Sequence, residues 1–287
     1  RANPGELVVI ADSHTCTCGG YGAIGIGVGS TEAAAAMATG TLDLEVPAVV
    51  QVYLTGKLKA NVFGKDLILQ LGQIFGTDYL TDKGLLLTGP GIGELSVEER
   101  MTVCNMGTEL GSMITLFGTE EKESDVEETR ELNLDDLVPK VARPFSPANV
   151  CDVREIAGMP ITQVVVGSCT NGRINDMEQV ARVLAKSKVH PDVNMFVVPS
   201  SKTVLDAMEA RGWTKIIRDA GATILNPGCG SCFGAHEGLI GERDVCIATT
   251  NRNFPGRMGC VKGQIYLTSP AVAAASAAAG RLVVPEE

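Results

Sequence analysis

The stretch that decides the fold is Ile161-Thr162-Gln163-Val164-Val165-Val166-Gly167-Ser168-Cys169, in which an apolar, β-branched run ends in glycine, serine and cysteine. Such a run is typical of a strand buried on both faces of a parallel sheet. A second run, Ala222-Thr223-Ile224-Leu225, comes shortly before Cys229-Gly230-Ser231-Cys232. Because ligand sites of α/β folds gather beyond the carboxyl ends of parallel strands, we expect the three cysteines at one edge of a sheet.

Three cysteines are one ligand short of a closed metal site. Structural zinc and ordinary iron–sulfur clusters take four protein ligands, whereas a catalytic metal keeps one coordination position open. Cys169, Cys229 and Cys232 therefore predict a metal or cluster that takes part in chemistry. The alternative is plain packing, because a Cys-x-x-Cys pair occurs by chance and free cysteine is often buried. The polar neighbours Ser168 and Thr170 argue against that alternative.

Length and composition limit the function classes. The 287 residues suffice for two or three domains with a substantial core. Nine cysteines are too few for a disulfide scaffold, which favours a cytoplasmic, reducing environment. The net charge of −10 is unlike that of a nucleic-acid-binding protein, and the Ala-rich stretch 271–279 is too short to cross a membrane. We therefore expect neither a nucleic acid partner nor membrane attachment.

Strands and helices alternate along the chain, which predicts an α/β fold with mainly parallel sheets. One helix start stands out at Ser96, where Glu99 completes a capping box. The segment from Glu120 to Glu131 is almost all charged or hydroxyl residues, so we expect a solvated loop or linker there. The expected strands are 7–11, 48–54, 161–166, 194–199, 222–225 and 245–248, and the expected helices are 31–39, 64–75, 95–106, 174–185, 202–210 and 214–220.

These elements predict three parts. Residues 1–46 are expected to be the C-terminal part of a first α/β domain, and a site-like motif so close to Arg1 predicts further sequence upstream. Residues 47–148 are expected to form a second α/β domain that ends in a charged loop and linker, 119–148. Residues 149–287 are expected to form a third α/β domain that carries the cysteines.

Polar side chains suited to acid–base chemistry and anion binding occur in three further places. Asp12-Ser13-His14 follows the first expected strand and suits proton transfer. Asn105 and Glu109 are four residues apart, so one helix face can present both. Asn251-Arg252-Asn253-Phe254-Pro255-Gly256-Arg257 carries two guanidinium groups, which match carboxylates bidentately. A surface hydrogen-bonded pair and ordinary surface arginines are the alternatives at the last two places.

Six motifs, in order along nearly the whole chain, resemble those of the aconitase superfamily. The form Gly-Ser-Cys-Thr-Asn-Gly-Arg is more similar to the large subunits of the 3-isopropylmalate dehydratase and homoaconitase branch than to aconitase itself. The motifs are Asp12-Ser13-His14-Thr15, Cys104-Asn105-Met106-Gly107-Thr108-Glu109, Gly167-Ser168-Cys169-Thr170-Asn171-Gly172-Arg173, Cys229-Gly230-Ser231-Cys232, Asn251-Arg252-Asn253-Phe254-Pro255-Gly256-Arg257 and Ser269-Pro270-Ala271.

The resemblance implies an aconitase-like fold, with several three-layer α/β domains around an iron–sulfur cluster. It implies that Cys169, Cys229 and Cys232 hold a [4Fe-4S] cluster with one open iron, which binds the hydroxyl and a carboxylate of the substrate. It also implies a pair, Asp12 and His14, that helps to handle the departing hydroxide. The full set of implied catalytic residues is Asp12, Ser13, His14, Asn105 and Glu109, and the implied substrate-binding residues are Asn251, Arg252 and Arg257.

The activity implied by the resemblance is that of an iron–sulfur-dependent hydro-lyase, which isomerises a 2-hydroxy carboxylic acid by dehydration and rehydration. Within the branch, conversion of 2-isopropylmalate to 3-isopropylmalate in leucine biosynthesis is the expected reaction. Homoaconitase and a dimethylmalate- or citraconate-type hydratase are the alternatives. The resemblance further implies a cytoplasmic heteromer, in which a separate small subunit carries the swivelling domain and the catalytic base.

Two alternatives from other classes stay open at this point. Some aconitase relatives are iron sensors that bind RNA, although an acidic chain without a basic groove speaks against that role. A zinc protein with cysteine ligands is the other, and metal analysis together with an absorption spectrum under argon would separate it from an iron–sulfur protein.

Overall fold

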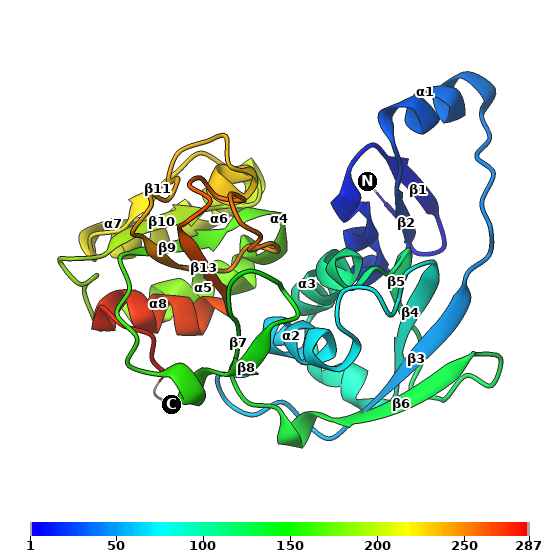
Figure 1. Ribbon diagram of the computed structural model, residues 1–287, viewed down its shortest axis with the longest axis horizontal. Coiled ribbons are helices and arrows are strands. Elements are labelled where there is room, and N and C mark those ends of the chain that lie inside the picture. Colours follow the sequence, from blue (N-terminus) through cyan, green and yellow to red (C-terminus); the bar gives the residue numbers. More distant parts are fainter. Residues whose placement is uncertain (1, 286–287) are drawn as a thin grey trace. The chain divides into compact units, whose positions relative to one another are not determined.

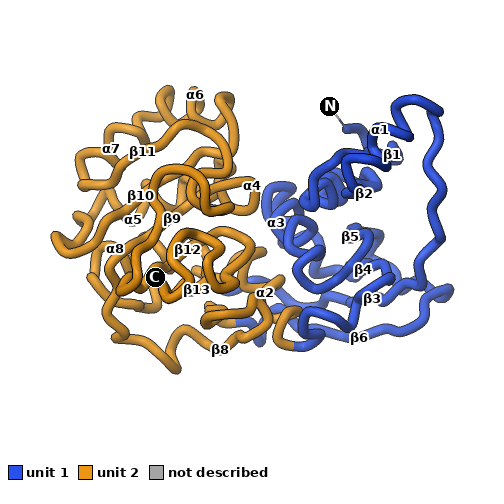
Figure 2. Tube along the Cα trace, turned by 45° about the horizontal axis from the view of Figure 1, so that its top comes forward, with its two compact units in different colours: residues 1–59, 74–137 blue, residues 60–73, 138–287 orange. Residues whose placement is uncertain are grey.

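The computed structural model describes residues 2–285, in which mostly parallel strands form three sheets (Figure 1). The chain folds into two compact units (Figure 2). Unit 1 comprises the residues up to 59 together with 74–137, and unit 2 comprises 60–73 together with the residues from 138 onward. The expected α/β class with mainly parallel sheets is confirmed.

The larger sheet of unit 1 has four parallel strands in the order β5-β4-β3-β6. Its centre is apolar: Val50, Val52 and Leu54 alternate along β3 and are all buried, as expected for one face of an interior strand. The helix α3 begins at the predicted capping box, in which Ser96 and Glu99 exchange hydrogen bonds. The elements of unit 1 named here are β3 (Ala48–Thr55), β4 (Lys83–Thr88), α3 (Val97–Gly107), β5 (Ile114–Phe117) and β6 (Glu128–Asn133).

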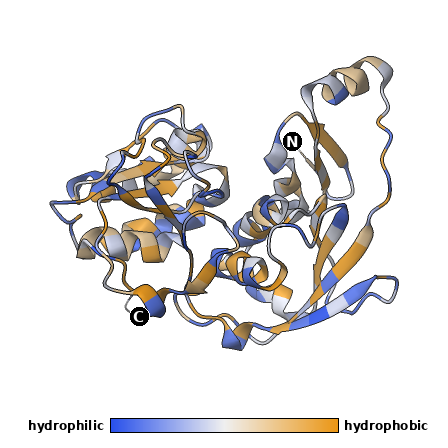
Figure 3. Ribbon diagram, in the orientation of Figure 1, coloured by the Kyte–Doolittle hydropathy of each residue, from blue (hydrophilic) through white to orange (hydrophobic). Residues whose placement is uncertain are grey.

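The prediction of a charged loop is wrong for residues 128–133, because they form the strand β6. This strand pairs in parallel with β3 and lies at the edge of the sheet. Figure 3 shows it as mainly hydrophilic beside the more hydrophobic β3. Charged side chains keep an exposed edge from pairing with another chain, so a hydrophilic composition does not exclude an edge strand.

A smaller sheet of unit 1 consists of two parallel strands, β1 (Leu7–Ile10) and β2 (Ile24–Gly27). The chain between them forms a 3₁₀ helix over Ser13–Tyr21. A Cβ atom on Gly20 would lie 2.6 Å from the backbone nitrogen of Met101 in α3. Only glycine therefore lets this 3₁₀ helix lie directly against α3, and this contact brings the residues after β1 close to the end of α3.

Unit 2 is built on a seven-stranded sheet in the order β11-β10-β9-β12-β13-β7-β8. From β9 the chain proceeds through β10 to β11 on one side, and β12 and β13 then extend the sheet on the other side of β9. The strand order thus reverses between β9 and β12, and α/β sheets bind ligands beyond the carboxyl ends of strands at such a point. The strands are β7 (Lys140–Ala142), β8 (Val150–Asp152), β9 (Gln163–Gly167), β10 (Asn194–Val198), β11 (Thr223–Ile224), β12 (Val245–Ala248) and β13 (Gln264–Leu267).

Helices cover one face of this sheet, and α5, α7 and α8 share a single hydrophobic core with alternate residues of β9, β10 and β12 (Figure 1). The long connection between β11 and β12 lies on the other face, where Gln163 Nε2 donates to the carbonyl of Gly238 (2.6 Å). That layer is irregular chain in place of helix. The helices of unit 2 are α4 (Ser168–Asn171), α5 (Ile174–Leu184), α6 (Lys202–Ala210), α7 (Trp213–Asp219) and α8 (Pro270–Ala279).

The helices α1 (Ser30–Thr39) and α2 (Gly64–Phe75) begin and end within one residue of the positions predicted from the sequence. The three sheets follow the expected three-part division, apart from β7, which precedes residue 149 but joins the third sheet. The compact units do not coincide with the expected boundaries at residues 46 and 148, so the three-domain division stays a prediction. Within residues 2–285, no helix is both long and apolar enough to cross a lipid bilayer.

Asp66, in the first turn of α2, is completely buried, and its two oxygens accept the backbone N–H groups of Phe63 (2.9 Å) and Lys140 (2.8 Å). Burial raises the pKa of Asp66 from 3.8 to about 7. A carboxyl group with a raised pKa keeps its proton in the folded protein over a range where the unfolded chain has lost it. Its contribution to the free energy of unfolding therefore falls as the pH rises from about 4 to about 7.

We expect Asp66→Asn to lower the free energy of unfolding by about 1–3 kcal/mol at pH 5, because the amide offers one oxygen to two N–H donors. The difference from the parent should narrow by pH 8, where the parent alone buries a charged carboxylate. Urea unfolding at pH 5 and pH 8 measures this difference in the free energy of unfolding. Asp192→Asn is the control, since that side chain is 88% exposed. A difference that stays constant or widens with pH would contradict the burial argument.

Candidate functional site

In unit 1 the turn after β1 places Asp12, Ser13 and His14 at the start of the 3₁₀ helix. The Asp12 carboxylate accepts the backbone N–H of His14 (2.8 Å), so it caps this helix. Aspartate is a preferred residue at such a cap. Asp12 and Ser13 are exposed, whereas His14 is half-buried. Asp12 thus holds the backbone of His14 and not its ring.

The ring of His14 is paired with Glu109, which lies 95 positions further along the chain. His14 Nε2 is 3.0 Å from Glu109 Oε1, and the Glu109 side chain is almost fully buried. Ser13 Oγ is 3.4 Å from the other ring nitrogen, Nδ1. A carboxylate that holds one nitrogen orients the imidazole and leaves the other nitrogen for proton transfer. The carboxylate partner of the imidazole is therefore Glu109, and the implied pairing of Asp12 and His14 in the reaction stays a prediction.

Asn105 joins the same group of unit 1. Its Nδ2 donates to Thr17 Oγ1 (2.9 Å), and Thr17 Oγ1 in turn donates to the backbone carbonyl of His14 (2.6 Å). The helix α3 ends at Gly107, and Glu109 lies in the 3₁₀ turn that follows. Asn105 and Glu109 are both buried, so the structure brings all five predicted catalytic residues of unit 1 to one place. Sequence reasoning missed Thr17.

In unit 2 Cys169 follows β9 at a sharp turn. Gly167 has φ 129°, and a Cβ atom there would lie 1.9 Å from the carbonyl oxygen of Val198. Ser168 has a left-handed backbone (φ 71°), which is strained for a residue with a side chain. The chain thus leaves the sheet abruptly and enters the short helix α4, whose second residue is Cys169. The turn places this thiol beyond the carboxyl end of β9, as the sequence predicts.

Asn251 connects the cysteine loops. Its Nδ2 donates to Cys169 Sγ (3.6 Å), and its Oδ1 accepts from Cys232 Sγ (3.3 Å). One amide therefore contacts the sulfurs of two loops that leave different strands, β9 and β11. Asn251 is completely buried and lies in the segment after β12 that also carries Arg252 and Arg257.

The cysteine pair is asymmetric: Cys232 is buried, whereas Cys229 is exposed. Burial raises the pKa of the Cys232 thiol and the nearby Cys169 adds to this effect, while the charge and hydrogen bonding of Arg257 oppose it. Arg257 therefore lies close to the sulfur of Cys232. In residues 2–285 no group of three or more His, Cys, Asp or Glu side chains is gathered so as to hold a single metal ion.

Several buried polar atoms around these loops have no hydrogen-bond partner within the described residues. The donors among them are Ser168 Oγ, Ser231 Oγ and Arg257 Nε, and the acceptors are Asn171 Oδ1 and Asn253 Oδ1. Each belongs to one of the segments that carry the predicted cysteines and arginines, and buried polar atoms are normally paired. The three donors suit an anionic group, such as the sulfides of an iron–sulfur cluster, among these loops. The residues present therefore fit the implied cofactor.

A buried polar network supports the Cys169 loop, and sequence reasoning missed it. Arg173 donates to the carbonyls of Cys169 (2.6 Å) and Thr170 (2.5 Å). The carboxylate of Asp176 accepts from Asn171 Nδ2 and from the backbone N–H of Arg173, both at 2.9 Å. Burial raises the pKa of Asp176 to about 6, and the charge of Arg173 opposes that shift. The only signal in the sequence is that Asp176 lies three residues after Arg173, from where a carboxylate can accept the N–H of the residue at a helix N-cap.

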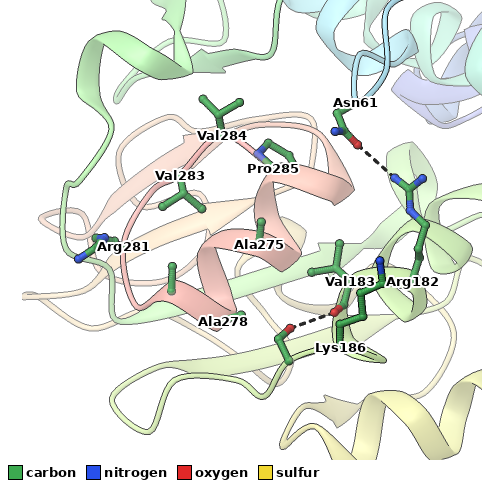
Figure 4. Close-up of a pocket in the computed structure, with 12 residues that line it drawn as sticks. Asn61, Arg182, Val183, Lys186, Ala275, Ala278, Arg281, Val283, Val284 and Pro285 are labelled. Atoms are coloured by element: carbon green, nitrogen blue, oxygen red, sulfur yellow. Dashed lines mark hydrogen bonds between the residues drawn. The ribbon is translucent and has the colours of Figure 1, made fainter. Parts of the chain in front are cut away.

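A pocket of about 660 Å³ lies elsewhere in unit 2, between α5, α8 and the chain after α8 (Figure 4). Val183 and Ala278 contribute to its apolar part, and Arg182 and Lys186 contribute charge. Arg182 reaches Asn61 Oδ1 (3.1 Å), as the dashed line in Figure 4 shows. No predicted site residue lines this pocket. The predicted residues of unit 2 lie instead on the loops after β9, β11 and β12, and this loop region is the candidate site of unit 2.

Comparison with known proteins gives a consistent result. The profile of the Aconitase family (aconitate hydratase) matches residues 1–127 and 120–280. The chain is 42% identical to 3-isopropylmalate dehydratase large subunit 1 of Methanopyrus kandleri and to large subunit 2 of Archaeoglobus fulgidus, in each case over 99% of this chain and 73% of the relative. It is also 42% identical to the 3-isopropylmalate dehydratase large subunit of Moorella thermoacetica, over 99% of this chain and 72% of the relative.

Among solved structures, the crystal structure of Thermococcus kodakaraensis aconitase X in its holo form matches with a TM-score of 0.57. The match covers 91% of this chain and 68% of that chain at 15% sequence identity, so it supports the fold alone. Both compact units carry the family motifs in their usual order, and the family profile extends over most of the chain. The chain therefore belongs to the aconitase family.

Proposed function

We propose that the chain is the large subunit of a 3-isopropylmalate dehydratase, a hydro-lyase that converts 2-isopropylmalate to 3-isopropylmalate in leucine biosynthesis. The observation that carries the proposal is the amide of Asn251, which contacts the sulfurs of both Cys169 and Cys232. Thiols from two loops are thereby held beside a segment with two arginines. Relatives that are 42% identical over 99% of the chain and bear the name of this enzyme support the choice of substrate.

The proposed cofactor is a [4Fe-4S] cluster held by Cys169, Cys229 and Cys232. Two observations support this cofactor. Three free thiols lie on these loops, and buried hydrogen-bond donors of the same loops have no partner among the described residues. When bound, such a cluster supplies an iron with an open coordination position, which acts as a Lewis acid toward a departing hydroxide. The protein contributes the shape and charge of the loops, and Asn251 orients two of the three sulfurs.

The substrate carries two carboxylates, and we assign Arg252 and Arg257 to bind them, next to Asn251. Removal of a proton from the carbon beside a carboxylate moves negative charge onto that carboxylate. A guanidinium group already in place stabilises this charge more strongly in the transition state than in the substrate. Arginine suits this role because its planar fork binds both oxygens of a carboxylate.

Proton transfer to the departing hydroxide is assigned to His14. Glu109 holds its Nε2, and Ser13 lies beside Nδ1. An imidazole oriented by a buried carboxylate can deliver a proton in one half of the reaction and recover it in the other. Asp12 and Asn105 position this residue, Asp12 through its backbone N–H and Asn105 through Thr17.

The relatives are named large subunits, so we propose that a small subunit completes the enzyme. No residue of this chain is assigned as the base that removes the carbon-bound proton, and that base is assigned to the small subunit with its swivelling domain. A cytoplasmic location is part of the proposal. Its support is that all nine cysteines are free thiols, as expected in a reducing compartment.

The cluster assignment predicts that Cys169→Ser prevents cluster assembly. Anaerobic reconstitution of the parent should give a brown [4Fe-4S] protein that loses one iron in air, and the variant should not. Iron analysis and the visible absorption spectrum measure cluster content in the parent and in the variant. Cys260→Ser is the matched control, because Cys260 is a free thiol of the same unit outside every predicted ligand motif. Retention of a full cluster by Cys169→Ser would rule the assignment out.

The carboxylate clamp predicts that Arg257→Lys lowers kcat/KM for 2-isopropylmalate at least about tenfold, since loss of a bidentate ion pair costs roughly 1.4 kcal/mol or more. Iron content should stay at the parent level, which separates substrate binding from cluster binding. Arg218→Lys on the exposed side of α7 is the control and should change little. Kinetics of Arg257→Lys within a factor of about two of the parent would exclude the clamp.

The subunit proposal predicts no turnover by the reconstituted chain alone and full turnover with a co-expressed small subunit. A half-site open to water lacks both the base and the dry surroundings that proton removal from carbon requires. Product formation from 2-isopropylmalate measures this, with homocitrate-type, dimethylmalate and citraconate substrates assayed in parallel. Turnover by the isolated chain would show that it contains its own base.

A further inference from the structure

Lys65 is the largest completely buried side chain of unit 2 with a charge, and only 1% of it is exposed. It lies in the first turn of α2, and its ammonium group donates to two backbone carbonyls, those of Thr249 (2.8 Å) and Thr250 (2.7 Å). These carbonyls are 184 and 185 positions further along the chain. None of the family motifs includes this lysine.

The two carbonyls belong to the start of the segment that carries the proposed substrate-binding residues. Thr249 follows β12 directly, and its hydroxyl accepts the N–H of Gly167 at the end of β9 (2.8 Å). Asn251 comes next, with its amide against the sulfurs of Cys169 and Cys232. Lys65 therefore holds the backbone at the point where the chain leaves the sheet and enters the site.

Two buried carboxyl groups lie within electrostatic range of Lys65. The ammonium is close enough to the buried carboxyl groups of Asp66 and Asp176 to act on both electrostatically. Asp176 belongs to the network beneath the Cys169 loop, where Arg173 supplies a second buried cation. A buried ammonium is stable only when carboxylates and carbonyls compensate for its lost hydration. Lys65 thus connects the supports of two site loops.

Lys140 offers a comparison within the same unit. It is also a buried lysine, 7% exposed, but its ammonium pairs with the carboxylate of Asp152 (2.6 Å), on the adjacent strand β8. This ion pair joins β7 and β8, which carry none of the predicted cluster ligands. The ammonium of Lys140 is thus held by a side chain, whereas two hydrogen bonds of Lys65 go to the main chain of the site segment.

We propose that Lys65 is a positioning residue, whose buried ammonium holds the carbonyls of Thr249 and Thr250 and thereby fixes Asn251 and Arg252 for the substrate. The part of this inference that concerns substrate rests on the proposed function. The part that concerns the order of the segment 249–253 does not. Replacement of the ammonium leaves two buried carbonyls without their donor, and the segment then loses its anchor at one end.

The test compares Lys65→Met with the parent by amide hydrogen exchange of segment 249–253, measured by mass spectrometry on the full chain. We expect exchange at least about tenfold faster in the variant, because a local anchor is lost. In the complex with the small subunit, KM for 2-isopropylmalate should rise about tenfold with a smaller change in kcat, since Arg252 is misplaced before chemistry. Iron content should match that of the parent, as all three cysteines remain.

Lys140→Met is the matched control and should change neither the exchange of segment 249–253 nor KM, although it also removes a buried ammonium. If Lys65→Met does not fold, Lys65→Gln replaces it, since a shorter neutral amide lacks the charge and the reach of lysine. Parent-like exchange of segment 249–253 in the Lys65 variant, or equal change in both lysine variants, would overturn the proposal. If the parent complex does not convert 2-isopropylmalate, the proposed function fails, while the exchange result still decides the role of Lys65.

Discussion

The candidate site of unit 2 depends on one hydrogen bond between neighbouring parallel strands, from the N–H of Gly167 to the hydroxyl of Thr249 (2.8 Å). These residues end β9 and follow β12, the two strands between which the strand order reverses. Loops that leave such a pair of strands diverge and open a crevice between them. The bond fixes where both loops start, so that Cys169 on one and Asn251 on the other meet at contact distance.

Buried polar groups next to these loops restrict the conformation of the loop backbone. Lys65, Arg173 and Asp176 are all buried, and their hydrogen bonds go largely to the backbone of the two site loops. A buried polar group that loses its partner costs far more than an exposed one, so such a network is stable in one arrangement. The same interactions therefore stabilise unit 2 and determine the geometry of the loops that carry the proposed cluster ligands.

The predicted catalytic residues of unit 1 are brought together by close backbone packing. Gly20 allows the 3₁₀ helix after β1 to lie against α3, and this packing brings His14 to Glu109. The sequence predicted both residues as members of the site. Asp12, two positions before His14, caps the helix, and the carboxylate at the imidazole ring is that of Glu109. Residues one or two positions apart are often held apart by such local capping.

The sequence by itself determined the elements and the chemistry that they carry. Apolar runs marked β9 and β12, the capping box marked α3, and the motifs placed three thiols and two guanidinium groups at strand ends. Local patterns report local structure, and they do so well where burial and turn chemistry agree. Only the tertiary structure decided that Glu109 holds His14, that Lys65 holds Thr249 and Thr250, and that charged β6 is an edge strand. These pairings join residues far apart in the chain, and packing of whole elements selects them because no spacing or periodicity encodes which distant groups will meet.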